Sequence, residues 1–126
     1  MLLDHLYVAK SVELSPGRVD AKLCLDPQHP IFRGHFPGAP VLPGVCMMHI
    51  VKEMLEKAAG SPLLLEEATY AKFLSMINPL ETDQIDVHIE YSQLEDRRYE
   101  VMASLQAGSR TCLKYKALFQ PAELSD

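Results

Sequence analysis

GHFPGAPVLPG, at residues 34–44, is the most unusual stretch of this 126-residue chain, and the apolar segment VCMMHIV follows it at residues 45–51. Its three prolines and three glycines predict a stiff, irregular loop, because Pro restricts φ and Gly permits conformations closed to other residues. One histidine, His35, lies inside the loop. A stiff loop that brings a titratable imidazole to the start of an apolar helix is typical of a functional site. We therefore expect residues 34–44 to form a site whose walls come from the rest of the chain.

A central helix is predicted to follow this loop. Between residues 45 and about 59 the apolar residues recur at helical spacing on one broad face, and Gly60 with Pro62 ends the pattern. The first turn is apolar all round, Val45 and Cys46 included, which predicts that the amino end of the helix is enclosed. No other segment has a convincing helical pattern, so one helix is expected.

The remaining segments predict strands. Alternating or β-branched patterns occur at residues 6–14, 19–25, 63–73, 85–91, 99–105 and 111–119, with turns at Ser15-Pro16-Gly17 and Ala107-Gly108-Ser109. Two strands before one helix and several antiparallel strands after it predict an α+β fold, in which an antiparallel sheet wraps around the helix. The length fits a single domain over residues 1–126. Exposed sheet edges favour a homodimer or a larger homo-oligomer built from dimers.

Composition excludes several kinds of function. The formal net charge of −5 argues against nucleic acid and anionic membranes as partners. The apolar runs are interrupted before the ~18 residues that a membrane span needs, and the N-terminus lacks the pattern of a signal peptide, which predicts a cytoplasmic protein. Cys24, Cys46 and Cys112 lack disulfide or zinc spacing and are expected to be small buried hydrophobes. We expect no metal and no cofactor.

The run His-Phe-Pro-Gly-x-Pro-Val-x-Pro-Gly-Val, from His35 to Val45, resembles the signature of the β-hydroxyacyl-acyl-carrier-protein dehydratases, which have the hotdog fold. The resemblance continues more weakly along the chain and includes Glu66 to Phe73, which looks like that family's strand after the central helix. It implies a hotdog domain that converts (3R)-3-hydroxyacyl thioesters to trans-2-enoyl thioesters, with an acyl carrier protein as the partner that carries the substrate.

The resemblance also implies roles for individual residues. His35 takes the place of the catalytic histidine that removes the C2 proton, a role that suits an imidazole near neutral pH. Gly44 matches the residue whose backbone N–H polarises the thioester carbonyl at the helix amino end, and Val45 offers a second N–H. At His49 the family has Asp or Glu, which faces the histidine of the other subunit and helps the 3-hydroxyl leave as water. This chain therefore departs from the family at its second catalytic group.

Three side chains on the helix are open to alternative interpretations. A protonated His49 is able to donate the proton, but on a helical wheel it also lies where the solvated face begins. Glu53, one turn further on, either orients His49, replaces the acid through a water, or is a surface carboxylate. Met48 is either core or part of an acyl tunnel.

The other candidates for lining such a tunnel are apolar residues, with ordinary packing as the alternative for each: Phe36, Phe73, Met76 and Ile77. On the last strand Arg110, Lys114 and Lys116 share a face in a regular alternation. With Lys72 or Arg33 they form either a basic patch for an acidic carrier protein or a plain solvated surface.

Three functions remain open from the sequence. The first is the dehydratase just described, with His35 as base and with His49 and Glu53 as further catalytic groups. The second is an acyl-thioester hydrolase of the same fold, in which Glu53 activates water. The third is a non-catalytic subunit that binds acyl chains or the carrier protein, an idea motivated by the missing acid.

Overall fold

The computed structural model describes residues 4–33 and 40–122. Its elements follow the order expected from the sequence, and their bounds are β1 Tyr7–Ser15, β2 Arg18–Leu25, the 3₁₀ turn η1 Pro30–Phe32, α1 Gly44–Ala59, β3 Leu63–Phe73, β4 Gln84–Gln93, β5 Tyr99–Ala107 and β6 Arg110–Pro121. The turn at residues 108–109 lies between β5 and β6, with Gly108 at a φ of 62°. The short turn η1 is the element that the periodicity did not predict.

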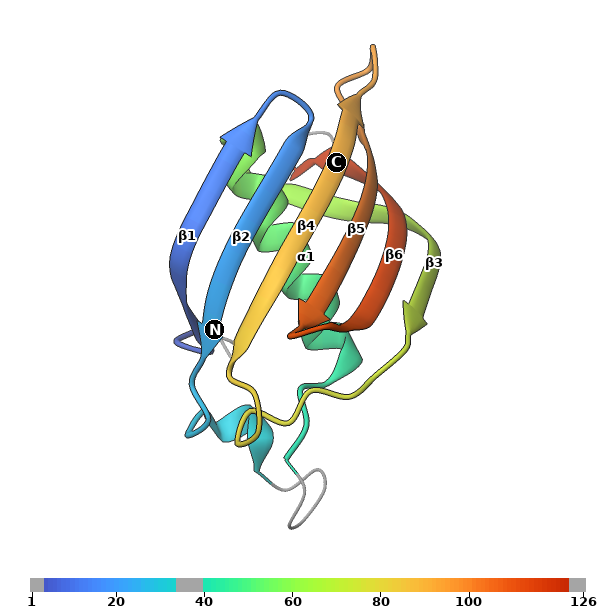
Figure 1. Cartoon of the computed structure of the whole chain (residues 1–126). Helices are drawn as coiled ribbons and strands as arrows, with labels where there is room; N and C mark the ends of the chain where they lie inside the picture. Colours follow the sequence, from blue (N-terminus) through green and yellow to red (C-terminus); the bar gives the residue numbers. More distant parts are fainter. Residues whose placement is uncertain (1–3, 34–39, 123–126) are drawn as a thin grey trace.

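The six strands form one antiparallel sheet in the order β1-β2-β4-β5-β6-β3. As Figure 1 shows, α1 lies behind the sheet and the strands curve around it. After α1 the chain crosses to the far edge, where β3 pairs only with β6 among the described strands. This arrangement confirms the α+β prediction of a sheet wrapped around one helix, which is the hotdog fold.

One face of α1 is fully buried against the sheet. Ile50, Met54 and Leu55 lie in the same buried cluster as inward residues of the strands, including Leu23 and Ile89. The alternation in the strands explains this packing, because every second side chain points toward the helix. Gly60 ends the helix in the left-handed conformation (φ 73°), which a residue without a Cβ adopts with little strain.

The amino end of α1 is less enclosed than the sequence predicted. Cys46 and Met47 are buried, but the side chain of Val45 is 73% exposed. Within the single chain Val45 is thus not enclosed as predicted, because the sheet covers only one side of the helix and leaves part of the apolar first turn uncovered. Of the three cysteines, Cys46 and Cys112 are buried as expected and Cys24 is half-buried.

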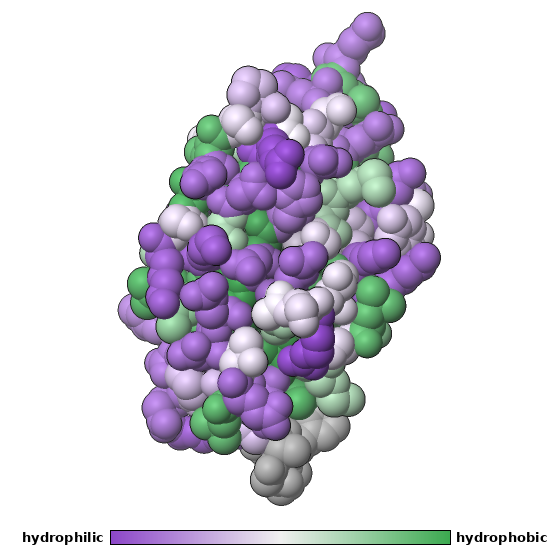
Figure 2. Space-filling view, in the orientation of Figure 1, coloured by the Kyte–Doolittle hydropathy of each residue, from purple (hydrophilic) through white to green (hydrophobic). Residues whose placement is uncertain are grey.

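The two faces of the sheet differ in character. Figure 2 shows the outer face, which faces away from α1 and carries mainly hydrophilic side chains with apolar residues scattered among them. At the β3 edge, residues 65–69 are all exposed, Leu65 among them at 42%. A free edge strand with apolar side chains beside it is a surface on which another chain can pair. Among the described residues, no helix has the length and apolar character that a membrane crossing requires.

Candidate active site

Two of the predicted site residues, His35 and Phe36, lie outside the described residues. The backbone on either side of them is anchored. Before the gap, buried His29 accepts the Ile31 N–H at Nδ1 (3.0 Å), and its Nε2 donates to the carbonyl oxygen of Asp4 (3.0 Å). After the gap, the Leu42 N–H donates to the Ile77 carbonyl (2.9 Å). The described segments that flank residues 34–39 are therefore hydrogen-bonded to the body of the protein.

The amino end of α1 presents free backbone donors. Pro43 occupies the N-cap position without a side-chain cap, and its carbonyl accepts the N–H groups of Cys46 and Met47 (3.0 and 3.2 Å). Within the described part of the chain, the N–H groups of Gly44 and Val45 donate to no acceptor. Unpaired N–H groups at a helix amino end stabilise negative charge on a nearby oxygen. These two groups have the chemistry predicted for binding a thioester carbonyl.

Phe73, the last residue of β3, packs against the start of the helix. A Cβ placed on Gly44 would lie 2.7 Å from Phe73 Cε1 and 2.8 Å from Cζ. Glycine at position 44 therefore allows the ring to lie directly over the first helical turn. Phe73 remains 51% exposed, so the ring lies beside the first helical turn without being buried there.

His49 lies one helical turn further along, beside an acidic residue. Its side chain is 23% exposed, and Nε2 is 3.7 Å from Glu53 Oε2, a distance at which a protonated imidazole and a carboxylate attract each other. The second carboxylate oxygen, Oε1, accepts a hydrogen bond from the Tyr7 hydroxyl at 3.0 Å. The structure thus brings together His49 and Glu53, as predicted from their spacing, and adds Tyr7 from β1.

Sequence reasoning missed Tyr7. It begins the first strand, 46 positions from Glu53, and no periodicity or motif connects the two. Burial, together with the nearby charge of Glu53, raises the pKa of the Tyr7 hydroxyl well above its usual value. The phenol therefore stays protonated and donates a hydrogen bond to the carboxylate.

Two hollows lie beside the helix. One, of about 210 Å³, contains His49 and is lined by Val45, Met48, Lys52, Leu65, Tyr115 and Phe119. The other, of about 330 Å³, lies at the Gly44 end and is lined by Val41, Leu42, Met47, Phe73, Leu74, Ser75 and Met76. Met48 and Phe73 each line one of them, so both candidates for acyl contact border a mainly apolar surface near the helix start. Chains of methylene groups bind to surfaces of this kind.

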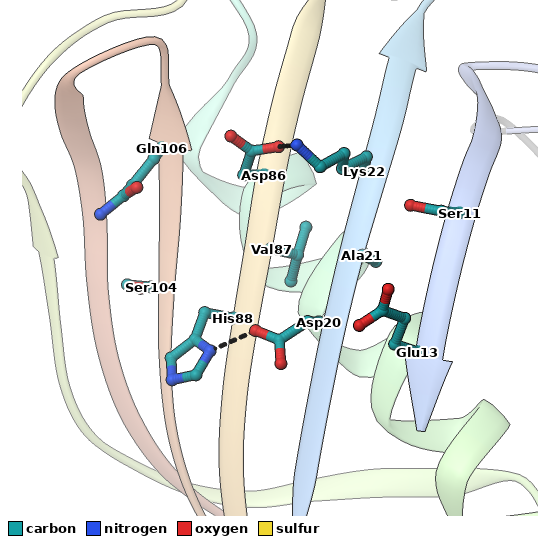
Figure 3. A pocket seen from close by; sticks show the side chains of 10 residues that line it. All are labelled: Ser11, Glu13, Asp20, Ala21, Lys22, Asp86, Val87, His88, Ser104 and Gln106. Atoms are coloured by element: carbon teal, nitrogen blue, oxygen red, sulfur yellow. Dashed lines mark hydrogen bonds and ion pairs between the residues drawn. The ribbon is translucent and has the colours of Figure 1, made fainter. Parts of the chain in front are cut away.

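A separate groove of about 370 Å³ lies on the outer face of the sheet, on the side away from α1 (Figure 3). Its main contact joins His88 Nδ1 to Asp20 Oδ1 at 2.6 Å. Hydrogen bonds from His88 and from Arg18 hold the pKa of Asp20 below its usual range. The groove shares no residue with the two hollows, and the part of the chain described here contains no group of His, Cys, Asp or Glu suited to a metal ion. We read this groove as a polar sheet surface.

The lysines of the predicted basic patch are also on the outer face. Lys72 lies opposite Lys114 in the β3–β6 pair, and Lys116 lies opposite Tyr70. Arg110 is not part of this row, because the β5–β6 register shifts between Leu105 and Gln106 and changes the alternation. Its guanidinium instead donates to Ser75 Oγ (2.6 Å) and to the Met76 carbonyl (3.2 Å). The prediction that Arg110 shares the face of the lysines was therefore wrong.

Comparison with known proteins agrees with this geometry. A sequence model of the ApeI-like dehydratases, described as ApeI dehydratase, matches residues 11–114. The chain belongs to this dehydratase family. It is 31% identical over 120 residues to the 3-hydroxyacyl-acyl-carrier-protein dehydratase FabZ of Ruminiclostridium cellulolyticum, with 82% of each chain covered. It is also 31% identical over 101 residues to the FabZ of Chloroflexus aggregans, with 71% of this chain and 70% of that one covered.

Among solved structures, the dehydratase heterocomplex ApeI:P from Xenorhabdus doucetiae superposes with a TM-score of 0.78. At 20% identity the match covers 90% of this chain and 97% of that one. This likeness supports the fold, while the sequence matches supply the family. Family membership confirms the resemblance seen at residues 35–45, and it supports a dehydratase function for this chain.

Proposed function

We propose that this protein is a (3R)-3-hydroxyacyl-thioester dehydratase that forms trans-2-enoyl thioesters on an acyl carrier protein, in fatty-acid or related acyl-chain biosynthesis in the cytoplasm. The observation that carries this proposal is the pair of N–H groups at Gly44 and Val45, which have no acceptor among residues 4–33 and 40–122. They follow the segment that contains His35, and His49 lies on the same helix. Binding of the thioester carbonyl at these amides stabilises the enolate that forms when C2 loses its proton.

Each proton in the reaction has an assigned donor or acceptor. His35 takes the C2 proton, and the electrons of that C–H bond move toward the carbonyl bound at Gly44. The C2–C3 double bond then forms as the C3–O bond breaks, and the departing oxygen takes a proton from His49 to leave as water. His35 has gained one proton and His49 has lost one, so proton exchange with solvent resets both. The chemistry requires no cofactor.

The arrangement of Glu53 favours dehydration over thioester hydrolysis. A hydrolase needs a carboxylate that is free to accept a proton from water, whereas one oxygen of Glu53 already accepts the Tyr7 hydroxyl and the other faces His49. Glu53 is thus better arranged to orient the imidazole than to activate water. We assign it an orienting role.

The active unit is proposed to be a dimer with a site at each interface. Among the described strands β3 pairs with β6 alone, and its other edge is open. Val45 and Leu65 present apolar surface in the hollow that contains His49. Pairing of two β3 edges would cover this surface and bring His49 of one subunit toward the loop of the other. Mixing inactive His35→Ala and His49→Ala chains should then restore part of the activity, because each mixed dimer contains one intact site. No recovery after confirmed subunit exchange would place base and acid on the same chain.

The lysine pair on the outer face is the proposed contact for the carrier protein. Lys72 and Lys114 lie directly opposite each other, and no carboxylate among the described residues forms an ion pair with either. An exposed cluster of like charge attracts an acidic partner and raises its rate of association.

The test of function is an assay of the purified protein with 3-hydroxyacyl and 2-enoyl thioesters, carried on an acyl carrier protein or on coenzyme A. We expect enoyl absorbance to appear with the 3-hydroxyacyl substrate and to be lost with the 2-enoyl substrate, without release of free thiol. Release of free thiol alone would show that the protein is a thioester hydrolase and not a dehydratase. If neither product forms with any chain length or carrier, the chain is a binding subunit. The similar Xenorhabdus structure is a heterocomplex. Activity that appears only when a second hotdog chain is added would show that the active unit is a heterodimer and not a homodimer.

A further inference from the structure

We propose that Tyr7 is a positioning residue of the dehydratase site, which holds Glu53 so that the carboxylate orients His49 for proton donation. This inference rests on the proposed function and extends it to the first strand of the sheet. It follows from two contacts that share one carboxylate, Tyr7 to Oε1 at 3.0 Å and His49 Nε2 to Oε2 at 3.7 Å.

Without Tyr7, the side chain of Glu53 would have little to hold it in place. It is 37% exposed, and a glutamate on a helix surface turns among several rotamers at little energetic cost. Strand β1 is the last strand on its side of the sheet, and Tyr7 reaches from it to the middle of α1. Its hydroxyl keeps its proton because burial and the charge of Glu53 both raise its pKa. The tyrosine therefore supplies a permanent donor that selects one rotamer of Glu53.

The orientation of Glu53 in turn determines which nitrogen of His49 is available. With Nε2 beside Oε2, a protonated His49 has its Nε2–H directed to the carboxylate, which leaves Nδ1–H to donate to the 3-hydroxyl. After the transfer the ring is neutral, and its remaining proton stays on the nitrogen next to Glu53. Tyr7 thus acts on the reaction only through Glu53 and touches neither substrate nor the reacting atoms.

The experiment is a double-mutant cycle on kcat with Tyr7→Phe, Glu53→Gln and the combined variant. Because an ill-placed acid lowers the rate of the chemical step, we expect each single variant to lower kcat about tenfold with KM within about twofold. The combined variant should lose no more than Glu53→Gln alone, because Tyr7 has nothing to orient once the carboxylate is absent. A tyrosine that merely ties β1 to the helix would lower the melting temperature without this non-additive effect on kcat.

Tyr91→Phe is the matched control. Tyr91 is also a half-buried strand tyrosine, and its hydroxyl has no partner among residues 4–33 and 40–122. Circular dichroism and thermal melting establish that each variant is folded. If Tyr7→Phe retains the kcat of the wild type, or if its effect adds fully to that of Glu53→Gln, the positioning role is wrong. If the wild-type protein forms no enoyl thioester at all, that result contradicts the proposed function itself. The two outcomes named before it contradict only the role of Tyr7.

Discussion

Replacement of Gly44 by alanine tests how Phe73 is packed on the start of the central helix. The new Cβ would lie 2.7 Å from Phe73 Cε1, so the ring has to move by about 0.7 Å to reach an ordinary contact of 3.4 Å. Crowding of this kind usually costs about 1–3 kcal/mol, and we expect the low end because the ring is half exposed and free to swing outward. Alanine also favours the helix by up to about 1 kcal/mol relative to glycine. The two effects should nearly cancel.

The cancellation predicts a specific coupling between the two positions. In the wild-type background, Gly44→Ala should change the free energy of unfolding by less than about 0.5 kcal/mol, whereas in a Phe73→Ala background it should stabilise the protein by up to about 1 kcal/mol. The assay is urea denaturation of the four proteins at one fixed concentration, since dimerisation makes stability depend on concentration.

A control at the other end of the helix separates crowding from backbone effects. Gly60 has a φ of 73°, and no atom lies within 4 Å of the position that a Cβ would take there. Gly60→Ala should therefore destabilise the protein by about 1 kcal/mol in both backgrounds, through backbone strain alone. If Gly44→Ala has the same effect with and without the Phe73 ring, the ring does not pack on the first helical turn, and the description of this part of the site is wrong.

Three further predictions concern the acid, the carrier protein and the outer face. His49→Glu should retain or raise dehydratase activity because it restores a carboxylic acid, whereas His49→Gln should lower kcat by about 100-fold or more; a loss with glutamate as large as that from removing His35 would show that the imidazole itself is required. Reversal of charge in a Lys72→Glu/Lys114→Glu variant should raise KM for substrates on the carrier protein much more than for coenzyme A substrates, and an equal change for both would exclude this docking surface. Asp20→Asn should remove at most about 1 kcal/mol of stability at pH 7, because the carboxylate and its partners Arg18 and His88 are partly exposed. Since the pKa of Asp20 is lowered in the folded protein, that stability exists above the usual aspartate pKa and is lost as pH falls through the folded value. Urea denaturation between pH 7 and pH 2 should therefore show wild type and variant converging in acid, and a constant difference would contradict the assignment.

Much of this fold was predictable because its signals are local. The alternation around Leu23 and Ile89 depends only on the period of two in a strand, and the end of the helix at Gly60 depends on a residue that tolerates positive φ. The predicted strand at residues 63–73 coincides with β3. The exposure of Val45 was not predictable in this way, because periodicity shows that a face is apolar but not what covers it.

The parts of the site that the sequence did not reveal depend on long-range contacts. The hydrogen bond between Tyr7 and Glu53 spans 46 positions, and only the curvature of the sheet around α1 brings the two together. Arg110 does not share the face of the lysines because the register between β5 and β6 shifts. The alternation of residues along the sequence does not predict such a shift. The pair of His49 and Glu53 was predictable, since residues four apart on a helix share a face. The roles of His35 and Phe36 remain predictions.

The rate at which the purified protein converts a 3-hydroxyacyl thioester on its carrier protein to the enoyl thioester, compared with that of His35→Ala, tests the central claim most directly. The proposed mechanism predicts enoyl absorbance with the wild-type protein, a loss of at least about 1,000-fold in the variant, and an unchanged melting temperature. Comparable activity in the two proteins would show that the base is not His35 and would contradict the proposed site.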